Sequence, residues 1–263
     1  MSCYKALAPD FLRESLKSVY DDPFFEKEVF IYCDGLLTES HYKIINCFKG
    51  KGLNAYYANE NKGLATAMNF LIDIVVKMNF KYIARMDADD IVINNRFERQ
   101  YKFLENNPSV DILGGWCIEI DDDGNEVFKK KLPTNHDDLK KKMIGRSCVI
   151  HPTIMVKSSV FESGLRFNEK LFNMQDYELW SRLFSCNYKF ANLNEFILKF
   201  RFDDNFISRR KGLDRFKVEI LLRYQHLKRN SLLNLSNILL ICFSSSSRLL
   251  PNFLLKFLYK KAR

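Results

Sequence analysis

Several signals that would assign this chain to particular protein classes are missing from its sequence. No two of the seven cysteines have the C-x-x-C spacing of zinc or redox sites, and their odd number argues against a disulfide framework. We therefore expect a reduced, cytoplasmic setting. The N-terminal residues show no charged region followed by an apolar one, so secretion is not expected. The apolar stretch at residues 231–243 is shorter than the roughly 20 residues of a membrane-spanning helix.

Net charge is nearly absent from most of the chain and is concentrated at its C-terminal end. Residues 1–208 carry 28 basic and 30 acidic side chains, whereas residues 209–263 carry 13 Lys and Arg against Asp214 and Glu219 alone. Hydrophobic residues make up 47% of the sequence, which excludes a mainly disordered chain. We predict a nearly neutral globular body and a basic tail. Such a tail suggests an anionic partner such as phosphate, nucleic acid or a membrane surface.

Strand-like and helix-like segments alternate along the first part of the chain. Residues 28–33 and 81–87 read as buried strands, and residues 11–20 and 63–80 have the apolar spacing of helices. This alternation predicts an α/β sheet with parallel strands, whose carboxyl ends bind ligands. The opening, MSCYK, resembles the end of a strand. It predicts either a very short first strand or a start inside the true reading frame.

Three aspartates, Asp87, Asp89 and Asp90, occupy four positions directly after an apolar run. Carboxylates this close repel one another unless a cation or water lies among them. A D-x-D motif at a strand end is a common means of holding Mg²⁺ or Mn²⁺ against a nucleotide diphosphate. Alone the motif is weak, because acidic turns are frequent. A second acid-rich stretch, residues 119–127, has turn chemistry and is predicted to form a hairpin.

Seven short motifs occur in the order found in one known family. They are SCYK (2–5), YCDG (32–35), NKGLATAMN (61–69), RMDADD (85–90), NRFERQ (95–100), HPTIM (151–155) and QDYELW (175–180). Through these motifs, which span about two thirds of the chain, the sequence resembles the family 2 inverting glycosyltransferases, which have the GT-A fold. The segment FISRRKG (206–212) resembles a C-terminal signature of the bacterial O-antigen and capsule enzymes.

The resemblance implies a UDP-sugar donor and a bound Mn²⁺ or Mg²⁺. The residues implied to contact the donor are Tyr4, Asp34, Lys62, Arg85 and Asp87. Tyr4 and Asp34 would contact the uridine, with Asp34 accepting a hydrogen bond from the uracil N3–H. Asp87 would face the ribose or the metal, and Asp89 would be the direct metal ligand. For Asp34 the alternative is a tight turn, and Gly63 and Asn69 are candidates for helix packing.

The motif QDYELW carries the second chemical prediction. Leu179, Trp180 and Leu183 have the spacing of an amphipathic helix, with Asp176 in its first turn. Inverting sugar transfer is a single displacement that needs one base to take the proton from the acceptor hydroxyl. By the resemblance Asp176 is that base, although Gln175 stands where many relatives have Glu. The alternative is an acid that only stabilises the helix N-terminus.

Three further basic residues are candidates for the site. The resemblance places His151 at the sugar pocket or near the metal, and a structural histidine is the alternative. Arg209 and Arg210 are expected to reach phosphate oxygens, for which guanidinium groups are well suited, with a solvated basic face as the alternative. Arg96 and Gln100 lie on one side of a predicted helix and are interpreted as structural.

We therefore expect a GT-A catalytic domain at residues 1–208 and a basic amphipathic helical tail at residues 209–263 that associates with an anionic membrane. The expected reaction moves a hexose, glucose or galactose, from a UDP-sugar to a saccharide on undecaprenyl diphosphate. By the resemblance it takes place at the inner face of the cell membrane, during the synthesis of O-antigen or another surface polysaccharide.

Two other functions share some of these features. A nucleotidyltransferase also combines an α/β sheet with acidic metal ligands, but it needs a glycine-rich phosphate loop, and YKALAPD (4–10) contains no glycine. A nucleic-acid-binding protein could use the basic tail. The aromatic residues of the tail stand mostly beside Leu and Ile, which favours burial or membrane contact over base stacking. We expect no nucleic-acid partner.

Overall fold

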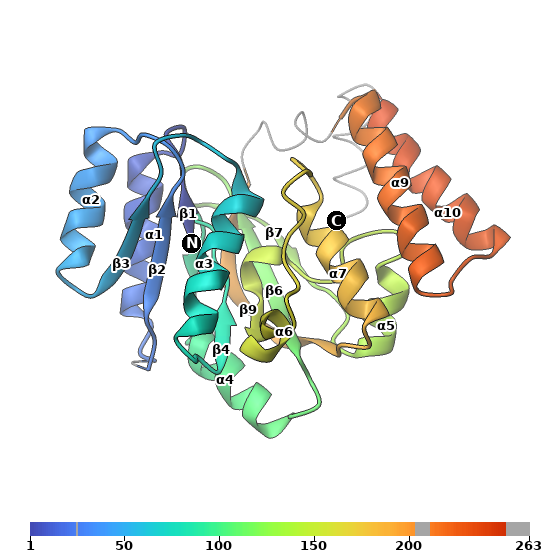
Figure 1. The fold of residues 1–263 in the computed structure, drawn as a ribbon, viewed down its shortest axis with the longest axis horizontal. Helices are drawn as coiled ribbons and strands as arrows, with labels where there is room; N and C mark the ends of the chain where they lie inside the picture. The colour runs from blue at the N-terminus through green and yellow to red at the C-terminus, as the bar shows by residue number, and fades with distance from the viewer. Residues whose placement is uncertain (25, 203–210, 251–263) are drawn as a thin grey trace.

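The computed structural model describes residues 1–24, 26–202 and 211–250 and shows β-sheets flanked by helices (Figure 1). The strands are β1 (Ser2–Cys3), β2 (Val29–Cys33), β3 (Leu53–Tyr57), β4 (Tyr82–Ala84), β5 (Ile91–Val92), β6 (Ile112–Ile120), β7 (Glu126–Lys130), β8 (Met155–Lys157) and β9 (Phe190–Arg201). The helices are α1 (Pro9–Asp21), α2 (Glu39–Lys49), α3 (Leu64–Lys77), α4 (Arg96–Asn106), α5 (His136–Lys142), α6 (Ser158–Glu162), α7 (Gln175–Ser185), α9 (Leu213–Arg229) and α10 (Leu235–Ser246). Two 3₁₀ turns, η1 (His151–Thr153) and η2 (Ser247–Leu249), complete the set.

The strands form two sheets. The first has the order β1-β2-β3 and is parallel throughout, as the alternating pattern predicts. The second has the order β4-β8-β6-β9-β5, with β7 beside β6, and is mixed. Its strand β4 pairs antiparallel with β8, whereas β6 and β9 run parallel. The predicted fold class, a mixed α/β sheet arrangement flanked by helices, is confirmed. The predicted hairpin at residues 119–127 is also confirmed, between β6 and β7.

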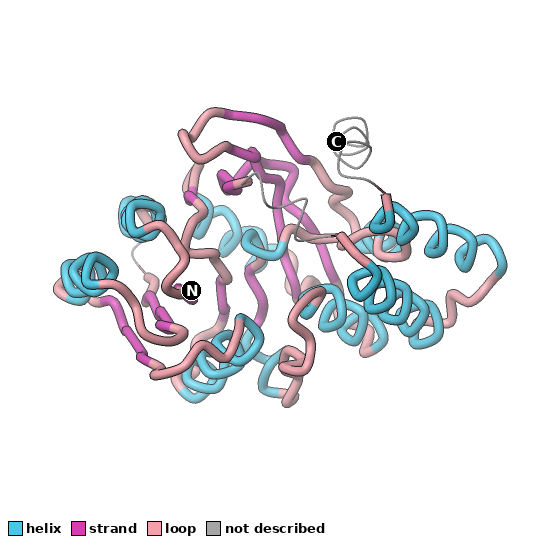
Figure 2. Tube along the Cα trace, turned by 90° about the horizontal axis from the view of Figure 1, so that it is seen from above, coloured by secondary structure: helices cyan, strands magenta, loops and turns pink. Residues whose placement is uncertain are grey.

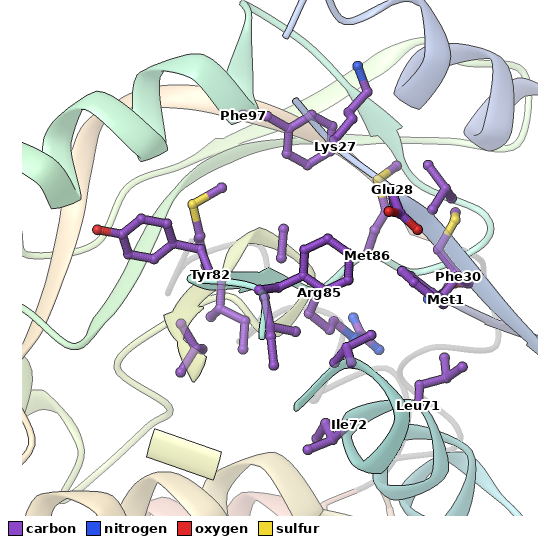
Figure 3. A pocket seen from close by; sticks show the side chains of 18 of the residues that line it. Met1, Lys27, Glu28, Phe30, Leu71, Ile72, Tyr82, Arg85, Met86 and Phe97 are labelled. Carbon is purple, nitrogen blue, oxygen red and sulfur yellow. The ribbon is translucent and has the colours of Figure 1, made fainter. Parts of the chain in front are cut away.

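The first strand is short, and an apolar pocket separates the two sheets beyond it. β1 has 2 residues, and its ladder with β2 ends where the Met1 amine donates to the Phe30 carbonyl (2.8 Å). Past this point β2 and β4 face each other across a pocket of about 360 Å³ (Figure 3). Phe30, Tyr82, Met86 and Phe97 are among the side chains that line it. Apolar side chains from both sheets therefore line the space between β2 and β4.

Local sequence explains where several helices begin. α1 starts at Pro9, whose fixed φ suits a first helical turn, and it buries Leu12 and Leu16 completely. α3 follows Gly63, which has a φ of +89° that favours glycine. The start of α7 follows Met174, which is left-handed at φ 60°. Both α3 and α7 therefore begin at sharp turns, and each turn brings a loop to the pocket that Tyr4 lines from the end of β1.

The described part of the basic tail forms a helical hairpin at the end of the molecule opposite β1–β3 (Figures 1 and 2). α9 packs on α7, where His226 Nδ1 lies 3.1 Å from the Ser181 hydroxyl and Leu222 joins the core cluster that contains Trp180. α10 packs on α9 through Ile241. Among the described residues, no helix combines the length and apolar character needed to cross a bilayer. α9 is thus attached to the helix that carries Asp176.

Candidate active site

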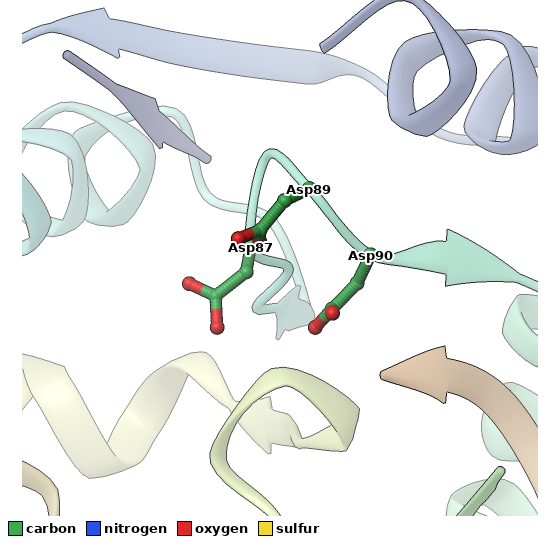
Figure 4. A group of neighbouring side chains, drawn as sticks. All are labelled: Asp87, Asp89 and Asp90. Atoms are coloured by element: carbon green, nitrogen blue, oxygen red, sulfur yellow. The ribbon is translucent and has the colours of Figure 1, made fainter. Parts of the chain in front are cut away.

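An acidic turn follows β4 and carries three carboxylates. The carboxylate oxygens of Asp87, Asp89 and Asp90 lie within 4.8 Å of one another (Figure 4). Asp90 is 1% exposed, and the other two are partly buried. The structure therefore brings together the two acids predicted to bind metal and adds a third, Asp90. Its signal was present in the sequence, since it directly follows Asp89 in the same motif.

Like charge and burial act against ionisation in this turn. Burial and the neighbouring Asp87 raise the pKa of Asp89 to about 6, and burial with both neighbouring acids raises the pKa of Asp90 well above its usual range. Within the described part of the chain, the buried Oδ2 of Asp90 has no hydrogen-bond partner. Three hard oxygen donors with an unmatched buried atom fit a divalent cation of the Mg²⁺ or Mn²⁺ type, whose charge would relieve the repulsion.

Two arginines support the acidic turn. Arg85 is 7% exposed and pairs with the Asp87 carboxylate, while its Nε and Nη1 have no partner in residues 1–24, 26–202 and 211–250. Arg201, at the end of β9, donates from its backbone to Asp90 Oδ1 (2.9 Å) and from Nε to the Asp89 carbonyl (3.1 Å). It also lies over the Phe11 ring at 3.8 Å. Arg201 was missed by the sequence analysis, because no local pattern links it to a turn 111 residues away.

Asp34 lies at the end of β2, 4% exposed, and binds the loop that starts α3. Its Oδ1 accepts from the Lys62 backbone N–H (2.7 Å) and its Oδ2 from the Gly63 N–H (2.9 Å). Gly35 has a φ of +89°, and a Cβ there would lie 2.9 Å from the Asn61 backbone nitrogen. The tight-turn alternative therefore describes the backbone here. Each Asp34 oxygen still has a free lone pair, so the carboxylate can accept a further hydrogen bond.

A second pocket, of about 420 Å³, is lined by three separate segments of the chain. Tyr4, 44% exposed, and Lys62 line it from the ends of β1 and the α3 loop, and Phe172 and Gln175 line it from the start of α7. Asn69 ties these segments together, because it exchanges two hydrogen bonds with the Phe167 backbone (2.8 and 3.0 Å). Tyr4 and Lys62, which are both predicted to contact the donor, thus line the same pocket as Gln175, the residue before Asp176.

Asp176 lies in the first turn of α7, as predicted, and is partly buried. It has no hydrogen-bond or ion-pair partner among the described residues. Its neighbour Glu178 differs, being 4% exposed and bound by Arg182 (2.8 Å) and Arg229 (3.3 Å). Of the two acids in this turn, Asp176 is therefore the one whose oxygens are open to a substrate.

His151 lies in η1 among aromatic rings. Its ring centroid is 5.6 Å from that of Phe167 and 5.8 Å from that of Trp180. Burial, with Arg85 nearby, lowers the pKa of His151 well below its usual value, so the ring is neutral. Its Nε2 is buried and has no hydrogen-bond partner among the described residues. These contacts favour the structural alternative.

The remaining predicted residues divide into two groups. The structural interpretation of Arg96 and Gln100 is confirmed: Arg96 is fully buried, donates to Gln100 Oε1 (2.9 Å), and donates to the Arg85 carbonyl (2.8 Å). The pair thereby holds the strand end that carries Arg85. Arg209 and Arg210 lie outside the described residues.

Residues 1–165 match the family model described as "Glycosyl transferase family 2". The chain is 27% identical over 264 residues to the amylovoran biosynthesis glycosyltransferase AmsE of Erwinia amylovora, covering 100% of this chain and 97% of that protein. It is 29% identical over 264 residues to the UDP-Gal:alpha-D-GlcNAc-diphosphoundecaprenol beta-1,3-galactosyltransferase of Escherichia coli, covering 99% and 94%.

The structure is similar to the crystal structure of S. aureus TarS 1-349 in complex with UDP-GlcNAc. The TM-score is 0.67 at 17% identity, over 94% of this chain and 73% of that chain, a likeness that concerns the fold. The nucleotidyltransferase alternative is set aside by the family match, which covers more than half of the sequence. The chain belongs to glycosyl transferase family 2, and it is a glycosyltransferase of the bacterial polysaccharide type with the GT-A fold.

Proposed function

We propose that this glycosyltransferase moves a hexose, glucose or galactose, from a UDP-sugar to a lipid-linked saccharide, with inversion at the anomeric carbon. The observation that carries the proposal is that the chain has two separate acidic features. One is the acidic turn at Asp87, Asp89 and Asp90, and the other is the Asp176 carboxylate, which has no partner among the described residues. Inverting transfer needs two separate sets of groups, because one must stabilise the leaving diphosphate and the other must accept the proton of the acceptor hydroxyl.

The donor is assigned to the edge of the sheets where β2 and β4 end. Tyr4 and Lys62 line the second pocket and are suited to contact the nucleoside and the phosphates. Asp34 fixes the Lys62 backbone and keeps lone pairs for the uracil N3–H. Asp87, Asp89 and Asp90 would hold Mn²⁺ or Mg²⁺, with Asp89 as the direct ligand. A divalent ion bound there supplies positive charge that offsets the charge of the diphosphate.

Asp176 is assigned as the base. Its oxygens are free to accept the proton of the acceptor hydroxyl as that oxygen attacks the anomeric carbon and the bond to UDP breaks. The helix dipole of α7 acts on it from the N-terminal turn. Gln175 lines the second pocket, which supports a base next to the donor. Arg85 is assigned to the diphosphate of the donor, since two of its buried nitrogens have no partner among the described residues.

The acceptor is proposed to be a saccharide on undecaprenyl diphosphate, and the enzyme is proposed to work on the cytoplasmic side, peripheral to the cell membrane. Support comes from the Escherichia coli relative, whose name specifies a diphosphoundecaprenol-linked acceptor and a UDP-Gal donor. The basic balance of residues 209–263 supports an anionic surface as a partner.

The test is a transfer assay with a panel of UDP-sugars, Mn²⁺ and membranes containing lipid-linked intermediates, with the product identified by mass and NMR. We expect one UDP-hexose to give a product with the inverted anomeric configuration. An excess of EDTA should stop the reaction. The variant Asp89→Ala should be inactive, and Asp123→Ala, in the exposed β6–β7 turn, is its matched control. A product of retained configuration, or full activity in EDTA, would contradict the proposal.

A further inference from the structure

Exposed apolar side chains gather on the last two described helices. Nine of the sixteen large hydrophobic residues that are exposed in the described parts of the chain lie between Leu213 and Leu249. Surface Leu and Phe residues scattered singly need no explanation, but a cluster of this kind marks an interaction surface. The question is which partner covers it.

α10 carries the densest part of this cluster. Leu235, Leu239 and Phe243 follow the i, i+4, i+8 spacing of one helix face and are 73%, 60% and 83% exposed. The opposite face is the one that packs on α9, where Ile241 is 2% exposed. α10 therefore has two apolar faces, of which one serves the fold and the other is uncovered. The helix has 12 residues and no charged side chain.

The charge of the tail selects among partners. Residues 209–263 hold 13 Lys and Arg against two acids. Of these acids, Glu219 is 1% exposed and is bound by Arg223 and Arg248, which leaves the exposed Asp214 against the other 11 basic residues. A second copy of this tail would bring two basic surfaces together, which is unfavourable. Anionic lipid headgroups complement it, and each basic residue near such a surface strengthens binding roughly fivefold.

We infer that the outer face of α10, formed by Leu235, Leu239 and Phe243, inserts into the interface of an anionic bilayer. The helix lies parallel to the surface, because 12 residues are too few to span the hydrocarbon core. α9 packs on both α10 and α7, so the membrane-bound helix is connected to the helix that carries Asp176. A function for this connection rests on the proposed function, in which the acceptor that the base deprotonates is linked to a lipid.

The test uses surface substitutions in the full-length chain. Removing the tail would uncover the side of α7 that α9 covers, so truncation would damage the fold. The test variant is Leu239→Ser with Phe243→Ser. The matched control is Met78→Ser with Val127→Ser, which changes two exposed apolar residues outside the tail, 45% and 49% exposed. Binding is measured by cosedimentation with phosphatidylglycerol vesicles and with phosphatidylcholine vesicles at low salt, without any sugar substrate.

We expect the wild type and the control to sediment with phosphatidylglycerol vesicles and weakly with phosphatidylcholine. The test variant should lose at least about tenfold in vesicle affinity while keeping its melting temperature and UDP binding. A second variant, Phe243→Trp, should show a blue-shifted emission when vesicles are added. Failure of the wild type to bind vesicles would overturn the inference. Vesicle binding by the test variant equal to that of the wild type would also overturn it. So would a wild-type dimer that the test variant no longer forms, because the face would then be assigned to a second copy of the chain.

These outcomes are independent of the proposed reaction. Vesicle binding is measured without transfer, and transfer can be measured on a short-chain acceptor without vesicles. An enzyme that binds vesicles but transfers no hexose would contradict the proposed function alone.

Discussion

Asp176 and Glu178 lie two residues apart in the first turn of α7, yet arginines hold only Glu178. Arg182 and Arg229 bind its oxygens at 2.8 and 3.3 Å, and the residue is 4% exposed. Asp176 has no such partner among the described residues. The same turn therefore contains one carboxylate that anchors α9 on α7 and another that is open to a substrate.

This difference predicts opposite effects for two conservative substitutions. Asp176→Asn keeps the shape of the side chain and removes its basicity, so turnover should fall by about 10²–10⁴-fold while UDP-sugar binding persists. Glu178→Gln should leave turnover per folded molecule within a few-fold of wild type. It should lower the free energy of unfolding by about 1–3 kcal/mol, because two partly buried arginines lose their partner. Single-turnover kinetics and urea unfolding measure both. Wild-type turnover in Asp176→Asn would place the base elsewhere.

A second prediction concerns the effect of the acidic turn on the free energy of unfolding. Burial and Asp87 raise the pKa of Asp89 to about 6, above its ordinary value of 3.8. The folded state therefore binds this proton more tightly than the unfolded state, and ionised Asp89 lowers stability above pH 6 when no metal is bound. In EDTA at pH 7.5, Asp89→Asn should raise the free energy of unfolding by about 1–3 kcal/mol. The gain should shrink as the pH falls toward 4. Destabilisation at pH 7.5 would show that Asp89 has a structural role.

The pH should also control metal binding at this turn. A cation competes with protons for Asp89, so Mn²⁺ affinity, measured by calorimetry, should fall as the pH is lowered from 7.5 to 5. Asp123→Ala should follow the wild-type curve. An affinity that does not change over this range would mean that Asp89 is not a ligand.

Sequence motifs predicted where several candidate residues lie, because their local structure depends on nearby residues. Asp34, Asp87 and Asp89 each follow a strand, and Asp176 opens a helix, so their positions could be derived from nearby residues. Arg201 could not, since it reaches the acidic turn from a strand 111 residues later. The engagement of Glu178 by Arg229 likewise depends on how α9 packs. Contacts between distant segments are set by tertiary packing, and the spacing of residues within a motif contains no information about them.

A fourth prediction concerns stability in acid. Burial lowers the pKa of His226 to about 4 from its ordinary 6.5. As the pH falls, His226 is protonated in the unfolded chain before it is protonated in the folded one. The stabilising contribution of neutral His226 is therefore complete above pH 6.5 and is lost as the pH falls to 4. The loss should reach about 3 kcal/mol. Urea unfolding from pH 7 to 4.5 should show it, and His226→Gln should flatten the decline. An unchanged decline in that variant would assign the effect to other groups, with His151 the first to examine, since burial also lowers its pKa.

The last prediction concerns Arg201, which supports the acidic turn from outside it. Its Nε donates to the Asp89 carbonyl (3.1 Å), its Nη2 pairs with Glu14 (2.8 Å), and its guanidinium lies over Phe11. Arg201→Gln keeps the backbone donor to Asp90 but loses these contacts, so the turn should be held less firmly. We expect Mn²⁺ affinity to fall by about tenfold, the lower end of the loss seen when supporting contacts of metal ligands are removed.

The matched control for Arg201 is Arg99→Gln, which breaks a surface ion pair with Glu195 and should leave metal affinity unchanged. Raising the Mn²⁺ concentration should restore the turnover of Arg201→Gln, because a positioning residue acts through the affinity of the site. Turnover that stays low at saturating Mn²⁺ would mean that Arg201 touches the substrate. Unchanged affinity would mean that the backbone donor to Asp90 suffices to position the three carboxylates.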